Sequence, residues 1–365
     1  MRILIATDAW RPQINGVVRT YERLDDELRE MGVEPAFLTP SEFTTVPCPT
    51  YPEIRLAIPG YTYVIERLAC AKPDAVHIAT EGPVGWMTRQ WCLNRRIPFT
   101  TAFHTRFPEY LSQRFRIPLD WTYAAQRRFH NAGAGLMVAS PSLATDLEAR
   151  GFERLMPWTR GVDTQNFHPR NIRLFGNAPV FLYVGRVAVE KNLDSFLSLD
   201  LPGRKVVVGS GPMLEILAAR YPDVLFTGKK DGEELAQCYA SAHVFVFPSL
   251  TDTFGIVLLE AMASGLPVAA FPVTGPIDNV IDGKTGVLDH DLRKACLHAL
   301  ELDRANIRTH ATTSDWGAAA RMFLSNVESA LFAKQGRRVP ARRRILSRRP
   351  RPARSTHSAG NPVRS

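Results

Sequence analysis

The chain contains the stretch Pro248-Ser-Leu-Thr-Asp-Thr-Phe-Gly-Ile-Val-Leu-Leu-Glu-Ala-Met-Ala-Ser-Gly-Leu-Pro267. An apolar run typical of a buried strand ends at Pro248, and another begins at Pro267. Between them lie a polar turn with Asp252 and Gly255 and a helical segment that carries Glu260. Strand, turn, helix and strand in this order predict one unit of a parallel sheet covered by helices.

The same alternation continues on both sides of this stretch. Short apolar runs predict strands at residues 3–7, 36–38, 75–79, 99–103, 136–140, 180–185, 205–209, 224–228, 244–248 and 267–271. This many parallel strands divide more naturally into two sheets than into one. We therefore predict an α/β fold with two facing, doubly wound Rossmann-like domains.

The break between the domains is predicted near residues 163–179, where prolines and a glycine interrupt the periodicity. An N-terminal, acceptor-side domain is expected at residues 1–165 and a donor domain at 166–314. A final helix is predicted at 315–333, with Asp315 as its N-cap. We expect this helix to cross back to the N-terminal domain.

The positive charge is concentrated at the C-terminal end. The formal net charge is +9, and the segment 334–365 contributes eleven positive residues and no acids. Subtracting these eleven charges leaves −2 on residues 1–333. The segment is rich in Arg, Pro and Ser, which predicts a disordered tail. Its role stays open between a solvated tail and adhesion to anionic lipid. No nucleic-acid partner is expected, because no recognition module accompanies the charge.

The cysteines and the N-terminal segment bear on the compartment. Five cysteines lie far apart without a C-x-x-C pair, which favours reduced thiols over disulfides or metal sites. Residues 2–7 resemble a strand rather than a signal peptide, and no apolar run approaches the ~20 residues of a membrane-spanning helix. We expect a cytoplasmic protein, with peripheral attachment to the inner face of the cell membrane as an open extension.

The turn after the strand that ends at Pro248 is the first candidate site. It places the amides of Thr253, Phe254 and Gly255 at a helix N-terminus, where unpaired N–H groups and the helix dipole favour an oxygen-rich ligand. Asp252 and Glu260 are eight residues apart, so both could address one ligand. The alternative is a capping aspartate and a solvated helix glutamate.

Three further groups follow predicted strands. Arg186 and Lys191, in Gly185-Arg-Val-Ala-Val-Glu-Lys-Asn-Leu193, could neutralise a diphosphate leaving group; otherwise they are two exposed basic residues. Gly16 precedes a helix and permits close backbone approach to a phosphate or sugar, or is an ordinary turn glycine. His104 ends an apolar strand, where it is either functional or structural. No clustered His or Cys set predicts a metal site.

The order of these motifs resembles the retaining glycosyltransferases of the two-domain GT-B fold, specifically family 4. The resemblance covers residues 1–332 and is carried by G-R-x-x-x-E-K-N-L at Gly185–Leu193 and by P-S-x-x-D-x-F-G-x-x-x-L-E-A-M-A-x-G-x-P-V ending at Val268. The E-x7-E pattern usual in the family is altered here to Asp252-x7-Glu260. The bacterial α-mannosyltransferase and glycolipid glycosyltransferase branch is indicated by the forms T-D-T-F-G, His77-Ile-Ala-Thr-Glu-Gly-Pro83, Phe103-His-Thr and Arg160-Gly-Val-Asp163.

The resemblance implies a role for each candidate residue. Arg186 and Lys191 would hold the donor diphosphate and replace a divalent metal, so that no metal or other cofactor is required. Glu260 would bind the ribose hydroxyls, and Asp252 with the amides of Thr253, Phe254 and Gly255 would contact the transferred sugar. Gly16 would close the phosphate side from the N-terminal domain, and His104 would lie beside the sugar. The base would lie near Gly228-Lys-Lys230.

The acceptor is expected to be a lipid or a glycan. Between Arg89 and Arg128 eight arginines occur with two acids, interleaved with Trp91, Phe107, Tyr110, Phe115, Trp121 and Tyr123. A basic, aromatic surface suits an anionic membrane, whereas the alternative is solvated arginines and core aromatics. The leading hypothesis is transfer of mannose, glucose or glucuronate from a GDP- or UDP-sugar to a lipid such as diacylglycerol or a sugar-lipid. The alternatives are a GDP-mannose-dependent α-mannosyltransferase with a soluble or polysaccharide acceptor, and a non-catalytic nucleotide-sugar-binding protein.

Overall fold

The structure is a computed structural model. It describes residues 1–334 apart from 14, 49–50, 59, 110–111 and 113–115. The predicted Arg-rich tail lies outside the described residues beyond Lys334, as do Tyr110 and Phe115 of the predicted aromatic surface.

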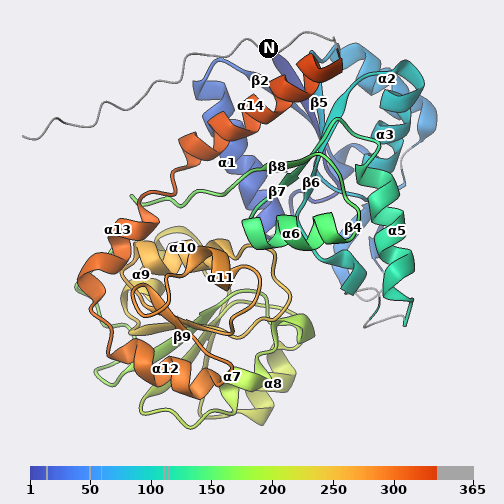
Figure 1. The fold of residues 1–365 in the computed structure, drawn as a ribbon. Coiled ribbons are helices and arrows are strands. Elements are labelled where there is room, and N and C mark those ends of the chain that lie inside the picture. Colours follow the sequence, from blue (N-terminus) through green and yellow to red (C-terminus); the bar gives the residue numbers. More distant parts are fainter. Residues whose placement is uncertain (14, 49–50, 59, 110–111, 113–115, 335–365) are drawn as a thin grey trace, which may run out of the picture.

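Two six-stranded parallel sheets form the centres of the two halves (Figure 1). The first has the order β2-β1-β5-β6-β7-β8, with β1 at Arg2–Ala6, β2 at Glu34–Leu38, β5 at Ala75–Ile78, β6 at Phe99–Phe103, β7 at Gly135–Val138 and β8 at Leu155–Pro157. The second has the order β11-β10-β9-β12-β13-β14, with β9 at Val180–Val184, β10 at Arg204–Val208, β11 at Leu225–Gly228, β12 at Val244–Phe247, β13 at Val268–Ala270 and β14 at Gly286–Leu288. The predicted pair of doubly wound sheets is therefore confirmed.

Helices cover both faces of each sheet. The first half contains α1 at Gly16–Glu30, α2 at Tyr61–Ala71, α3 at Pro83–Arg95, α5 at Leu119–His130 and α6 at Pro141–Ala149. The second contains α7 at Asp194–Leu197, α8 at Leu214–Arg220, α9 at Gly232–Ala240, α10 at Ile256–Ala263, α11 at Pro276–Asn279, α12 at Leu292–Leu300 and α13 at Ile307–Ala311. Short 3-10 turns lie at Pro40–Glu42, Val189–Lys191 and Arg304–Asn306. The central strands read as continuous apolar runs because these layers bury both of their faces.

All ten predicted strands are present, most of them ending a residue or more earlier than predicted. The runs had included residues such as Thr7, Gly185 and Pro248, which leave the sheet and begin the next loop. Three features were not predicted: β8, β14 and an antiparallel hairpin of β3 at Thr45–Cys48 and β4 at Tyr51–Ala57. β8 and β14 have three residues each and lie at sheet edges, so their apolar runs are too short to stand out.

The last helix, α14 at Trp316–Lys334, packs on the first sheet although it follows the second in sequence (Figure 1). Asp315 accepts hydrogen bonds from the amides of Gly317 and Ala318, which confirms the predicted N-cap. Phe323 is fully buried in one apolar cluster with residues of α1, β1 and β5. Among the described helices, none has the length and apolar character needed to cross a membrane.

Candidate active site

The loops that follow β9 and β12 meet at the carboxyl ends of the strands of the second sheet. These strands are hydrogen-bonded neighbours and run parallel, so their carboxyl ends lie side by side. Asn192 donates from Nδ2 to the carbonyl oxygen of Pro248 at 3.1 Å and joins the two loops. The two strongest sequence motifs therefore form one site rather than two.

Lys191 and Asp252 form the centre of this site. Lys191 Nζ lies 2.6 Å from Asp252 Oδ1, and each side chain is about one fifth exposed, at 20% and 19%. Asp252 Oδ2 is buried and has no hydrogen-bond partner among the described residues; Ser249 Oγ and Thr251 Oγ1 share this property. A buried polar atom without a partner costs about 1–3 kcal/mol, so three in one loop make it a candidate binding site for a polar ligand.

The loop ends at the N-terminus of α10. Gly255 adopts φ +81°, a conformation that favours glycine, and no side chain of the residues that the structure describes caps the helix there. The first amides of α10 are thus available to an anionic or oxygen-rich group. Phe254 is 93% buried beneath the loop, and its carbonyl oxygen accepts a hydrogen bond from Asn279 at 2.8 Å.

Glu260 lies deeper in α10 and is only 4% exposed, so it is not a solvated helix residue. Its Oε2 accepts a hydrogen bond from the Tyr239 hydroxyl at 2.8 Å, and its Oε1 lies 3.5 Å from Arg19 Nη1. Burial raises the pKa of Glu260, while Arg19 and Tyr239 oppose the shift. Asp252 and Glu260 therefore have different partners, one in the loop before α10 and the other within the helix.

The first half contributes residues that face the start of α10. A methyl group built on Gly16 would lie 3.9 Å from Ile256 Cδ1, so Gly16 faces the first residue of α10. The next amides of α1, at Val17 and Val18, already donate to Asn15 Oδ1 at 3.0 Å each. Close backbone approach at Gly16 remains open, but the next two amides are used for capping.

His104 reaches the loop of the second half through its backbone. Thr253 Oγ1 donates to the His104 carbonyl oxygen at 2.7 Å. Its imidazole is bonded within the first half: Nε2 lies 2.9 Å from the Tyr21 hydroxyl, and Arg160 Nη2 donates to Nδ1 at 3.1 Å. The structure thus brings His104 next to Thr253, with both ring nitrogens already in hydrogen bonds.

Arg186 follows β9 in the same loop as Lys191, and its side chain is half-buried. Its carbonyl oxygen accepts a hydrogen bond from the Tyr183 hydroxyl at 2.8 Å. Near the segment predicted for the base, Lys229 pairs with Asp231 at 2.6 Å, and Asp231 also meets Arg19 across the halves at 3.2 Å.

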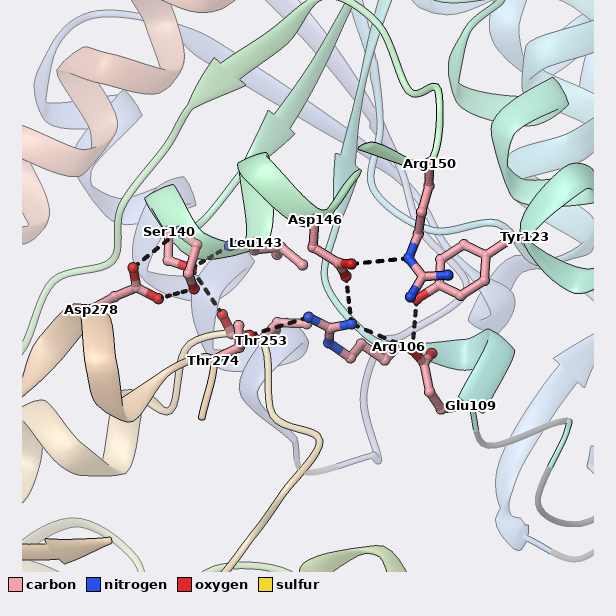
Figure 2. Close-up of polar contacts among 11 residues, drawn as sticks. Arg106, Glu109, Tyr123, Ser140, Leu143, Asp146, Arg150, Thr253, Thr274 and Asp278 are labelled. Atoms are coloured by element: carbon pink, nitrogen blue, oxygen red, sulfur yellow. Dashed lines mark hydrogen bonds and ion pairs between the residues drawn. The ribbon is translucent and has the colours of Figure 1, made fainter. Parts of the chain in front are cut away.

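A polar seam joins α6 to the second half on one side of the site (Figure 2). Asp278 accepts hydrogen bonds from the amide of Ser142 at 3.1 Å and from its hydroxyl. Arg106 bridges Asp146 at 2.7 Å and Thr274 Oγ1 at 3.2 Å, as Figure 2 shows. The halves are therefore held against each other around the candidate site.

Several residues that line this site were not predicted. Arg19 and Tyr21 follow Gly16 on α1, Tyr239 lies on α9, and Arg160 was quoted only as part of a resemblance. The one local signal was that Arg19 lies one helical turn after Gly16 and so projects from the same side of α1.

Only some of the basic and aromatic residues between Arg89 and Arg128 are exposed. Trp91, Tyr123 and Arg89 are 4%, 3% and 8% exposed, so the surface interpretation is wrong for these three, and the alternative of core aromatics is confirmed for Trp91 and Tyr123. They pack or bond inside the first half; Arg89, for example, donates to the Phe129 carbonyl oxygen. The exposed part contains Trp121, which is 72% exposed, together with Phe107 and several arginines.

Comparison with known sequences identifies the family. The family described as "Glycosyltransferase Family 4" matches residues 14–166, and "Glycosyl transferases group 1" matches residues 178–301. A GDP-mannose-dependent alpha-mannosyltransferase of Corynebacterium glutamicum is 30% identical over 79% of this chain and 76% of its own length. The chain belongs to glycosyltransferase family 4. The family expected from the motifs is confirmed.

Other relatives of this glycosyltransferase act on different substrates. The sulfoquinovosyl transferase SQD2 of Arabidopsis thaliana is 33% identical over 75% of this chain, and the match spans 61% of the plant protein. The alpha-monoglucosyldiacylglycerol synthase of Streptococcus pneumoniae is 26% identical over 82% of this chain and 78% of its own. In fold, the family 4 chain resembles the sucrose-phosphate synthase of Thermosynechococcus elongatus, with a TM-score of 0.71 and 22% identity over 91% and 99% of the two chains. This confirms the predicted GT-B architecture.

Proposed function

We propose that this glycosyltransferase moves a hexose from a GDP- or UDP-sugar to a lipid or glycolipid acceptor, with retention of anomeric configuration and without a metal. One observation carries the proposal. The Lys191–Asp252 pair lies before α10 in a loop where three buried polar atoms, Asp252 Oδ2 among them, have no partner within the described part of the chain. A pyrophosphate-linked sugar supplies the anionic and hydroxyl groups that such a site requires.

We assign each part of the donor to the residues whose chemistry suits it, and these residues come from both halves of the chain. Lys191 and Arg186 bind the diphosphate, and the α10 amides with Asp252 hold the hexose. Glu260 accepts hydrogen bonds from the ribose hydroxyls, because a buried carboxylate that already holds one hydroxyl, from Tyr239, has the geometry to accept more. Gly16 closes the phosphate side from α1.

The reaction is a substitution at the anomeric carbon. The bond from this carbon to the diphosphate oxygen breaks, and a bond to the acceptor oxygen forms on the same face of the sugar. The acceptor proton passes to the leaving diphosphate oxygen, so no protein carboxylate is consumed as a nucleophile. Lys191 and Arg186 stabilise the charge that develops on the diphosphate, which is the task a divalent metal performs elsewhere. Activity that persists in excess EDTA is the expected result.

The acceptor is proposed to lie in a membrane. One curated relative is named for a diacylglycerol-based lipid product. On α5 an exposed face contains Trp121, Ala124, Ala125 and Arg128, spaced at helical intervals. An exposed tryptophan next to arginines suits the headgroup region of anionic lipid.

The test starts from the purified chain with GDP-mannose, UDP-glucose and UDP-glucuronate. We expect one donor to raise the unfolding temperature with the logarithm of its concentration above its Kd, since a ligand at 100 times its Kd stabilises the folded state by about 2.7 kcal/mol. The same donor should then be consumed with diacylglycerol or a glycolipid, and NMR of the product should show an unchanged anomeric configuration. An inverted product would contradict the mechanism, and the absence of binding by every nucleotide sugar would contradict the function.

A further inference from the structure

A chain of hydrogen bonds leads from Arg160 through His104 into the first sheet. Arg160 Nη2 lies 3.1 Å from His104 Nδ1, and His104 Nε2 lies 2.9 Å from the Tyr21 hydroxyl. That hydroxyl lies 2.8 Å from His77 Nε2, and His77 Nδ1 lies 2.8 Å from Thr100 Oγ1. His77 and Tyr21 are fully buried, so water does not compete for these bonds.

The chemistry of arginine determines the directions of the two hydrogen bonds made by the His104 ring. A guanidinium only donates, so His104 Nδ1 must accept and the neutral ring carries its proton on Nε2. This proton is donated to the Tyr21 oxygen, which leaves the Tyr21 proton for His77 Nε2. His77 then donates from Nδ1 to Thr100. The alternative for the last two bonds, in which His77 donates from Nε2 to Tyr21 and accepts from Thr100 at Nδ1, leaves the Tyr21 proton without an acceptor among these residues.

The charges around His104 oppose its protonation. Arg160 is 4% exposed, and no carboxylate among the described residues pairs with it. Burial lowers the pKa of Arg160 to about 10, which leaves it cationic at neutral pH. Burial and the nearby Arg160 lower the pKa of His104 well below its usual 6.5, and His77 from β5 and His130 from α5 add to the shift. The remaining neighbours are the Tyr21 hydroxyl and the ring of Trp158, which bring no negative charge at neutral pH.

We infer that Arg160 is a positioning residue that holds His104 as the neutral Nε2–H tautomer, so that His104 shapes the sugar side of the site and transfers no proton. This inference rests on the proposed function for the place of His104 beside the sugar. With both nitrogens in use, the ring has only its C–H edges free. Its carbonyl oxygen receives Thr253 Oγ1, so the same residue also holds the loop that begins α10.

The first test measures the tautomer and needs no donor or activity. In protein labelled with ¹⁵N-histidine, long-range ¹H–¹⁵N correlation spectra distinguish Nε2–H, Nδ1–H and cationic rings, and His104→Gln assigns the signal. We expect His104 to remain neutral with its proton on Nε2 from pH 5.5 to 8.5. A cationic ring, or a proton on Nδ1, within that range would overturn the inference while leaving the proposed function untouched.

The second test is the pH profile of transfer for Arg160→Met against Arg127→Met. Arg127 is exposed and also donates to a backbone carbonyl, that of Arg150 at 2.9 Å, so it is a matched control. In Arg160→Met, burial still lowers the pKa of His104 but the nearby cation is gone, so the pKa should rise and the rate relative to wild type should fall as the pH decreases from 7.5 to 5.5. A constant ratio over this range would overturn the inference.

A third variant covers the case in which Arg160→Met fails to fold. Tyr21→Phe removes the hydroxyl on the other side of His104 but leaves Arg160 in place, with exposed Tyr63→Phe as the control. The inference predicts that His104 keeps the Nε2–H tautomer in Tyr21→Phe, because Arg160 alone determines it. A switch to Nδ1–H would show that Tyr21 sets the tautomer and would overturn the assignment to Arg160.

Discussion

Replacing Lys191 by Met removes the positive charge at the proposed diphosphate site with little change in side-chain volume. Lys191 Nζ lies 2.6 Å from Asp252 Oδ1, and Asp252 Oδ2 already lacks a partner among the described residues. The variant therefore leaves a mostly buried carboxylate without its cation, which costs about 1–3 kcal/mol of folding free energy. Loss of one charge-stabilising group in the transition state lowers kcat by about 10²–10³-fold.

A matched control separates these effects from the general loss of a lysine. Lys294 forms an ion pair of similar length, 2.7 Å to Asp289, but its side chain is 55% exposed. Lys294→Met should change the free energy of unfolding by less than about 1 kcal/mol and leave kcat unchanged. Urea unfolding and initial rates of sugar release from the preferred donor measure both quantities. Equal stability and near-wild-type turnover in Lys191→Met would refute the assigned role.

Three further predictions concern the fold, the pH dependence and the membrane. Phe323→Ala should destabilise the protein by about 3–5 kcal/mol in urea unfolding, because Phe323 is fully buried against the first sheet; a loss below 1 kcal/mol would show that α14 does not pack there. Burial raises the pKa of Asp8 from 3.8 to about 6, so the folded state keeps this proton up to a higher pH than the unfolded state does. The free energy of unfolding should therefore fall by about 3 kcal/mol as the pH rises from 3.8 to about 6. Asp8→Asn should remove this pH dependence of the free energy of unfolding. A variant with the same pH profile of unfolding as the wild type would contradict the assignment to Asp8. Trp121→Ser should leave unfolding within about 0.5 kcal/mol of wild type but lower flotation with anionic vesicles about tenfold or more; unchanged flotation, or none in the wild type, argues against this surface.

Much of the fold could be predicted because buried parallel strands leave continuous apolar runs. The edge strands β8 and β14 could not, since three residues at a sheet edge carry little apolar signal. The same holds for the hairpin β3–β4, which contains Pro47 and Pro52 and pairs outside both main sheets. Predicted strands were too long where the last residue of the apolar run is a glycine or proline, because that residue already belongs to the following loop.

The sequence predicts the site residues that lie within one motif, but not the partners that come from distant segments. Asp252 and Lys191 stand out because each follows a strand within a dense motif. Arg19 reaches Glu260 across 241 positions of sequence, and only the approach of the two halves brings them together. The partners of His104 likewise come from separate elements, so the sequence named the histidine without indicating that both of its nitrogens are engaged.

The central claim is that one site, formed by the loops after β9 and β12 and by α10, binds the nucleoside diphosphate of the donor. Isothermal titration of UDP and of GDP into the wild type, Lys191→Met, Glu260→Gln and Lys294→Met tests it directly. We predict that the nucleotide bound by the wild type binds at least about tenfold more weakly to the first two variants, a loss of about 1.4 kcal/mol or more, and equally well to the third. Wild-type affinity in both Lys191→Met and Glu260→Gln would contradict the claim.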